Sequence, residues 1–196
     1  SFQRVLDAGG LRPAVPLEAS LIGPPLGETL KRITGIEDEA TLAGLIEAFK
    51  QDYDNAGFRQ TLAFDGVAEG LARLAAAGSR LFIVTNKRLV PTRKIPDALG
   101  LGGYFPGVHP RDEPAPMAPS KSAVTKRVIA RYAIVPGNAF FVGDSDEDRQ
   151  AATENGIPFI HAIYGYGTVG GAGRLGGMVL ERMIDLPDLA LGNAKD

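Results

Sequence analysis

The stretch Phe140–Asp148 reads FFVGDSDED, an apolar run that changes within two residues into a cluster of acids. The run Ala139–Val142 predicts a buried strand, and residues 146–154 predict a helix that ends at Asn155-Gly156. A buried strand that leads directly into a helix is the repeating unit of a parallel sheet with helices on both faces. The stretch therefore predicts an α/β fold built on a doubly wound parallel sheet, of the Rossmann-like kind.

The same alternation of strands and helices continues through the chain after residue 63. Apolar runs predict further strands, and amphipathic segments predict further helices. The strands are Arg80–Thr85 and Pro158–Ile163, and the helices are Val67–Ala77, Pro91–Leu99 and Ser120–Tyr132. Met178–Leu191 is expected to add a short final strand and a frayed terminal helix. Since ligands bind at the carboxyl ends of parallel strands, chemistry is expected just after Val84 and Val142.

The first third of the chain shows a different pattern. Apolar residues recur every three or four positions across Glu39–Tyr53, which is the stripe of an amphipathic helix. Phe2–Leu6 and Glu28–Ile33 predict shorter helices, separated by the proline- and glycine-rich turn Ile22–Gly27. We therefore expect two domains: a small all-helical domain over residues 1–62 and the α/β domain over residues 63–196.

The overall composition excludes several classes of protein. A net charge of −2 provides no basic field for nucleic acid or for an anionic membrane surface. The absence of cysteine excludes disulfides, thiolate zinc sites and a cysteine nucleophile. No apolar run reaches the length of a membrane span. We therefore expect a cytoplasmic protein whose partners include neither nucleic acid nor a membrane.

The acids after Val142 are the first candidates for chemistry. Asp144 is expected at the end of a strand and beside the start of a helix, a position that suits a hard cation such as Mg²⁺. Ser145 and Asp148 also allow a purely structural interpretation, in which Ser145 caps the helix and Asp148 completes a capping box. Both interpretations stay open for these two residues, whereas Asp144 is the leading metal candidate.

Two further positions are suited to binding a phosphate group. Thr85 ends a predicted strand, and its hydroxyl and the amide groups behind it, at Asn86, suit a phosphoryl oxygen, although Thr85 also fits an ordinary turn. Lys121 follows Ser120 at the first turn of a helix, where a lysine is disfavoured unless an anion lies nearby. The alternative for Lys121 is a solvated surface lysine.

Gly165, Gly167 and Gly170 have the spacing of a dinucleotide-binding loop and follow a predicted strand. The helix that such a loop requires is not predicted, because four more glycines occupy positions 171–177. The pattern therefore does not indicate a nicotinamide or flavin cofactor.

The order of these elements is similar to that of a known family. A helical segment with Ile22-Gly-Pro-Pro-Leu26, then Val84-Thr-Asn-Lys87, then the helix-opening Lys121, then Gly143-Asp-Ser-x-x-Asp148 resembles the phosphoglycolate phosphatase-like branch of the haloacid dehalogenase superfamily. The resemblance extends across nearly the whole chain, with Gly-Asp-Ser-x-x-Asp as its most specific part. It implies that residues 1–62 are a helical cap on a Rossmann-like core.

The resemblance also implies roles for individual residues. Thr85, with Asn86, would bind the transferred phosphate, and Lys121 would neutralise charge on the phosphoryl group. Asp144 would ligate Mg²⁺, and Asp148 would either approach the metal or hold Lys121 in place. Lys126 is the alternative if Lys121 is not the family's lysine.

One element of the family pattern has no match in the sequence. The family carries its nucleophile and its general acid in an Asp-x-Asp pair on the first core strand, and nothing before residue 60 can supply it. Asp7 lies in a helical segment, and Asp65 does not follow a buried strand. We therefore expect an Asp-x-Asp segment upstream of Ser1, and expect the chain by itself to be inactive.

The resemblance implies a reaction class. The expected activity is magnesium-dependent hydrolysis of a small phosphorylated metabolite, a phosphoglycolate-like phosphate monoester, through an aspartyl-phosphate intermediate. The alternative is a non-catalytic binding or regulatory domain that keeps the fold but lacks the nucleophile.

Overall fold

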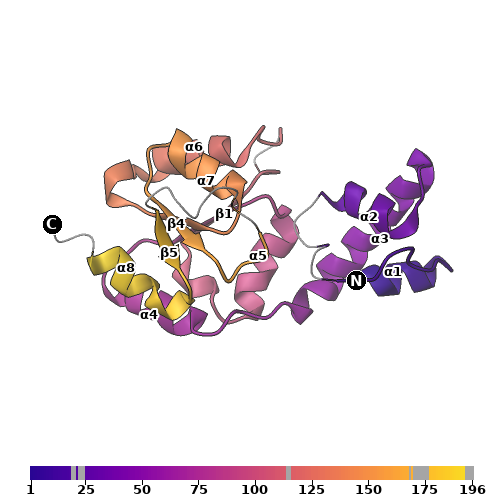
Figure 1. Ribbon diagram of the computed structural model, residues 1–196, viewed down its shortest axis with the longest axis horizontal. Coiled ribbons are helices and arrows are strands. Elements are labelled where there is room, and N and C mark those ends of the chain that lie inside the picture. Colours follow the sequence, from indigo (N-terminus) through magenta and orange to yellow (C-terminus); the bar gives the residue numbers. More distant parts are fainter. Residues whose placement is uncertain (19–20, 22–24, 114–115, 168, 170–176, 193–196) are drawn as a thin grey trace. The chain divides into compact units, whose positions relative to one another are not determined.

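The computed structural model describes residues 1–196 except 19–20, 22–24, 114–115, 168, 170–176 and 193–196. The chain forms two compact units, Ser1–Thr61 and Leu62–Asp196 (Figure 1). Half of the turn expected at Ile22–Gly27 and most of the glycine-rich segment after Gly167 lie outside the described residues. In the part of the chain that is described, no helix is long and apolar enough to cross a membrane.

The first unit is helical, as the sequence predicts. Its elements are α1 (Phe2–Ala8), α2 (Leu26–Thr34), α3 (Glu39–Asn55) and a short 3₁₀ helix, Gly57–Gln60. Asp38 starts α3 because its carboxylate accepts a hydrogen bond from the Thr41 amide at 2.8 Å. Gly35 ends α2 with φ of 70°, a conformation that glycine adopts without strain. The apolar faces of the helices meet in a small core formed by Val5, Leu30, Leu42 and Leu45.

The second unit alternates strands and helices, and the elements predicted for it are confirmed within a few residues at each end. Its helices are α4 (Val67–Ala76), α5 (Leu89–Ala98), α6 (Lys121–Tyr132), α7 (Asp146–Glu154) and α8 (Leu186–Gly192). Its strands are β1 (Phe82–Thr85), β2 (Gly107–Pro110), β3 (Phe141–Gly143), β4 (Phe159–Ala162) and β5 (Met178–Leu180). The sequence analysis missed β2.

All strand pairings are parallel, as expected, but the strands form two sets. One set pairs β1 with β2, and the other has the order β3-β4-β5. Val84 is aligned with His109 in the first set, and Val142 with Ile160 in the second. Consequently β1 and β3 each have a strand neighbour on one side only among the described residues.

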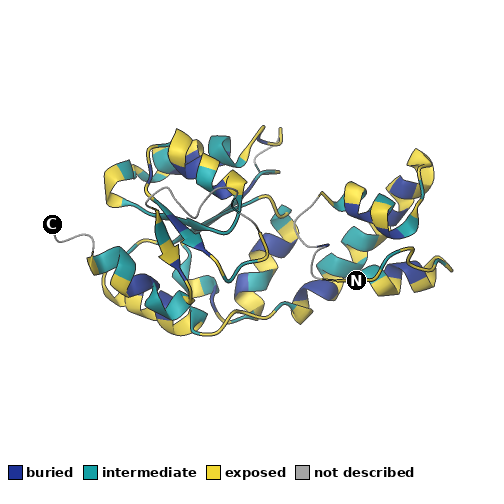
Figure 2. Ribbon diagram, in the orientation of Figure 1, coloured by how far each residue is buried: buried dark blue, intermediate teal, exposed yellow. Residues whose placement is uncertain are grey.

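A cavity of about 1090 Å³ lies between the two sets of strands. Its walls are mostly apolar. They include Phe82 and Val84 of β1, Val142 of β3 and Phe140 just before it, and Leu71 and Val128 of helices α4 and α6. Because of this cavity, β1 is only half-buried (Figure 2). β3 is also half-buried, whereas Ile160 of β4 is fully buried. The sequence prediction that β1 and β3 are buried strands is therefore wrong for the described residues.

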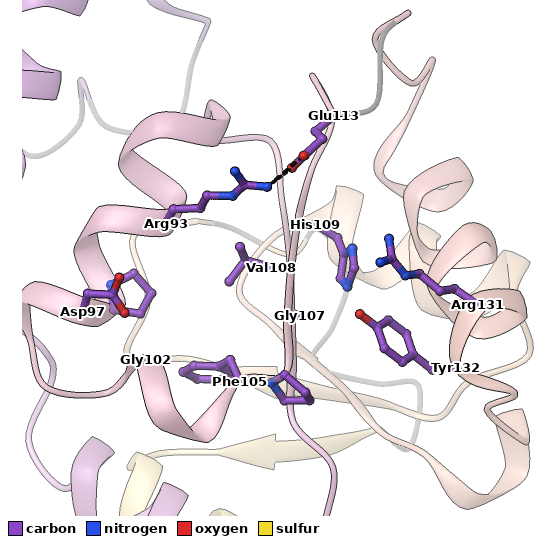
Figure 3. A pocket seen from close by; sticks show the side chains of 12 residues that line it. Arg93, Asp97, Gly102, Phe105, Gly107, Val108, His109, Glu113, Arg131 and Tyr132 are labelled. Carbon is purple, nitrogen blue, oxygen red and sulfur yellow. Dashed lines mark hydrogen bonds and ion pairs between the residues drawn. The ribbon is translucent and has the colours of Figure 1, made fainter.

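A second, smaller hollow of about 510 Å³ lies along β2, between α5 and α6 (Figure 3). Arg93 of α5 forms an ion pair with Glu113 at 2.8 Å on one side of the strand. His109 lies on the other side, beside Arg131 and Tyr132. Its Nε2 atom is buried and has no hydrogen-bond partner in the described part of the chain. Burial of the ring lowers the pKa of His109, Arg131 and Arg127 lower it further, and Glu113 opposes them.

His109 makes the stability of the second unit sensitive to acid. Its folded pKa lies below the unfolded value of 6.5, so the unfolded chain binds more protons, and stability is lost as the pH falls below about 6.5. We expect His109→Gln to reduce the decrease in melting temperature between pH 7.5 and pH 5.5, as measured by calorimetry. His161→Gln, which replaces the only other histidine, controls for the cost of losing an imidazole. An unchanged pH dependence in His109→Gln would contradict this prediction.

Candidate active site

The acids after β3 begin α7 and form the capping box that the sequence allowed. The Ser145 hydroxyl accepts a hydrogen bond from the Asp148 amide at 3.3 Å. In return, Asp148 Oδ2 accepts from the Ser145 hydroxyl at 2.6 Å and from the Ser145 amide at 3.2 Å. These contacts satisfy amide groups that a helix start leaves unpaired. The structural interpretation of Ser145 and Asp148 is thus confirmed.

Asp148 also forms a buried ion pair with Lys121. Lys121 Nζ donates to Asp148 Oδ1 at 2.6 Å, and the two side chains are only 11% and 9% exposed. The pair connects the first turns of α6 and α7, which pack against each other. The interpretation of Lys121 as a solvated surface lysine is therefore wrong. Lys126, the alternative lysine, lies exposed on α6.

Asp144 is held beside this pair by main-chain contacts. Its own amide donates to Asp148 Oδ2 at 3.3 Å, and its Oδ2 accepts from the Gly167 amide at 2.9 Å. A Cβ atom at Gly167 would lie 2.6 Å from the Asp144 carbonyl oxygen, and one at Gly165 would overlap the Asp144 side chain. Both glycines are therefore needed for the loop after β4 to approach Asp144. The sequence analysis noticed their spacing but missed this role.

The end of β1 reaches the same cluster through Asn86. The Asn86 side-chain amide donates to Glu147 Oε2, which joins the loop after β1 to the first turn of α7. The Thr85 hydroxyl accepts from the Lys87 amide at 3.1 Å, a local turn contact. The structure thus brings together Lys121, Asp144 and Asp148. Thr85 is connected to this group only through the chain, because it directly precedes Asn86, which contacts Glu147. The sequence analysis did not single out Glu147 as a partner of Asn86.

The cluster carries more negative than positive charge, which favours a cation. Asp144 has one carboxylate oxygen without a protein donor among the described residues, whereas both oxygens of Asp148 accept hydrogen bonds. Within the described ranges, no group of three acids or histidines is arranged to hold a metal. Mg²⁺ is commonly bound through one or two carboxylates, with substrate oxygens and waters completing the shell. Asp144 fits as one of those carboxylates, and a second ligand from the protein would have to join it.

The buried pair should dominate the stability of this region. Asp148→Ala would leave Lys121 buried without a counter-charge and remove the capping box, so we expect a loss of about 3–5 kcal/mol in urea unfolding. Asp146→Ala is the matched control, because Asp146 lies in the same first turn but pairs with Arg149 while 56% exposed. That exposed pair should contribute no more than about 1 kcal/mol. Equal losses in the two variants would contradict the assignment.

The chain is similar to proteins of a known family. Residues 1–162 match the family model described as haloacid dehalogenase-like hydrolase. The chain is 31% identical over 168 residues to the tyrosine-protein kinase PtkA of Mycobacterium tuberculosis, covering 85% of this chain and 56% of that protein. It is 32% identical over 164 residues to a phosphoglycolate phosphatase of Nitrosospira multiformis, covering 78% and 70% of the two chains.

The solved structures agree at the level of the fold. A haloacid dehalogenase-like hydrolase of Streptococcus pneumoniae superposes with a TM-score of 0.79 at 19% identity, covering 97% of this chain and 88% of that one. The chain spans about half the length of PtkA. The family model covers well over half of this chain. The chain belongs to the haloacid dehalogenase-like hydrolase family.

Proposed function

We propose that the protein is a magnesium-dependent phosphatase that hydrolyses a small phosphate monoester through an aspartyl-phosphate. The observation that carries this proposal is the buried Lys121–Asp148 pair, joined through the Asp144 amide to a second carboxylate where β3 ends. Carboxyl ends of parallel strands are where such folds bind ligands. The similarity to phosphoglycolate phosphatases supports the choice of reaction.

Each residue of the cluster has a separate role in the proposed reaction. Lys121 has three ammonium donors, of which Asp148 uses one, so the others are available to a phosphoryl oxygen. Asp148 forms the ion pair with Lys121 and holds its side chain in place. Thr85 and the amide of Asn86 would bind another oxygen of the phosphoryl group. Asp144 would hold Mg²⁺, which neutralises negative charge on the phosphoryl group when bound.

The proposed nucleophile is an aspartate on a strand that occupies the cavity between β1 and β3. Both walls of this cavity are strands whose facing edges lack a partner among the described residues, and its lining is largely apolar. An extended strand in this position would form hydrogen bonds with β1 on one side and β3 on the other, through its amide and carbonyl groups. Its side chains, above and below the sheet, would pack against the apolar walls. A strand parallel to its neighbours would end beside Asp144 and Lys121.

The helical unit is proposed to act as the cap of this enzyme. The resemblance to this family implies the role of a cap for residues 1–62. A cap excludes water from the reacting phosphate and selects substrates by shape. The substrates would be small phosphorylated metabolites, and no nucleic acid or membrane is proposed as a partner.

A second candidate is phosphoryl transfer to or from a protein tyrosine. It is favoured by the 31% identity to PtkA, whose name describes a tyrosine kinase. The same lysine and aspartates would bind the phosphoryl group in either direction. Release of inorganic phosphate from a small ester by the full-length protein supports the phosphatase, and transfer from ATP to tyrosine without ester hydrolysis supports the kinase. A protein with neither activity would agree with a non-catalytic binding domain.

Replacement of Asp144 tests the metal assignment. In the full-length enzyme, Asp144→Asn should lower turnover by at least about 100-fold, because it removes a carboxylate from the cation while keeping the size of the side chain. The Mg²⁺ concentration for half-maximal activity should rise in parallel. Turnover would be followed as phosphate release across a Mg²⁺ titration. Wild-type rates in this variant would refute the assignment.

The two proposed phosphate-binding side chains should differ in importance. Lys121→Ala should reduce turnover by about 100-fold, since it removes charge stabilisation at the transferred group. Thr85→Ala should cost about 10-fold or less, because one hydrogen bond is lost while the backbone donors remain. Lys126→Ala, on the exposed face of α6, is the control and should retain wild-type activity. If Lys126→Ala lost turnover and Lys121→Ala kept it, Lys126 rather than Lys121 would be the lysine that stabilises the transferred group.

A further inference from the structure

We infer that Phe64 and Tyr166 bind the leaving group of the substrate, and that this group is a flat aromatic ring. The inference rests on the proposed phosphatase activity and defines its substrate class as aryl phosphate monoesters. Three aromatic side chains carry the argument, because they gather at the edge of the active site and two of them expose their rings.

The three rings form one cluster within the second unit. Phe64 contacts Tyr164 edge to face, with ring centroids 5.0 Å apart, and Tyr166 at 5.7 Å. Tyr164 is half-buried, and its hydroxyl donates to the Met183 sulfur at 3.5 Å. Tyr164 is thus the anchored member of the cluster. Phe64 and Tyr166 are 41% and 59% exposed, so two touching aromatic side chains remain partly in water.

The cluster lies at the active site because of the residues on each side of Tyr166. Gly165 and Gly167 both contact Asp144, and the Gly167 amide donates to its carboxylate at 2.9 Å. The residues directly before and after Tyr166 therefore both touch Asp144, the proposed metal ligand. The negative charge of Asp144 also contributes, after burial, to raising the pKa of Tyr164.

Chain topology places Phe64 at the same edge. Phe64 comes shortly before α4, which leads through a short turn into the beginning of β1. The start of α4 therefore lies at the edge where the strands end, as does the loop after β4 that carries Tyr166. The ring contact between Phe64 and Tyr166 confirms that these two segments meet.

The exposed rings specify the chemistry of the leaving group. Aromatic rings bind other flat rings through offset or edge contacts, each of which changes affinity by about 2- to 10-fold. The Tyr166 hydroxyl has no hydrogen-bond partner among the described residues, so the ring rather than the hydroxyl is the expected contact. In the reaction, the bond from phosphorus to the aryl oxygen breaks and an oxygen from water becomes bound to phosphorus. One proton of that water passes to the aryl oxygen, which leaves as a phenol.

The test compares phenyl phosphate with ethyl phosphate in the full-length enzyme with Mg²⁺. Tyr166→Ala should raise the KM for phenyl phosphate by about 2- to 10-fold and leave the KM for ethyl phosphate unchanged. Tyr166→Phe should behave as wild type with both esters. Val135→Ala is the control, because Val135 is 61% exposed but lies before β3, at the opposite edge of the strands. Equal changes with both esters, or no change with phenyl phosphate, would overturn the inference.

A binding measurement separates failure of this inference from failure of the proposed function. If neither ester is hydrolysed, the phosphatase proposal fails, and calorimetry with phenylphosphonate and methylphosphonate then tests the ring contact alone. Tighter binding of phenylphosphonate to the wild type, lost in Tyr166→Ala and kept in Tyr166→Phe, supports the aromatic site. Equal affinities for the two phosphonates in the wild type would overturn it.

Discussion

The buried ion pair between Lys121 and Asp148 is the interaction on which the candidate site depends. Two charges removed from water are tolerated only when each has a partner, and here the partners come from the first turns of different helices. Asp148 serves three groups at once, since it holds Lys121, caps α7 and accepts from the Asp144 amide. One carboxylate therefore fixes the relative positions of a cation, a helix start and a second acid. Positioning of this kind is what phosphoryl transfer requires.

The local parts of this arrangement could be predicted from the sequence. An apolar run, a glycine and Ser-x-x-Asp predict a strand, a turn and a capped helix within fifteen residues, and the structure contains all three. Strand β2 was missed because Gly107-Val-His-Pro110 has no apolar run and includes both residues that disfavour strands. Its strand conformation comes from pairing with β1, a partner more than twenty residues earlier.

The non-local parts could not be predicted from patterns alone. Lys121 was proposed to need an anion, but its burial and its choice of Asp148 depend on how α6 packs against α7. The contacts of Gly165 and Gly167 with Asp144 depend on the loop after β4 lying against the residue that follows β3. Alternating strands predicted one covered sheet, whereas the structure has two sets with a cavity between them. Periodicity reports which residues are apolar, and it does not report which strand lies beside which.

The facing edges of β1 and β3 also affect how the protein avoids association with other chains. An unpaired strand edge is a template for any extended segment, and natural proteins protect such edges with charges, prolines or covering elements. Here the two edges border apolar walls, so an unrelated strand would gain both ladder hydrogen bonds and burial by entering. Exposed edges of this kind favour pairing with extended segments of other chains, whatever the free energy of unfolding of the native protein.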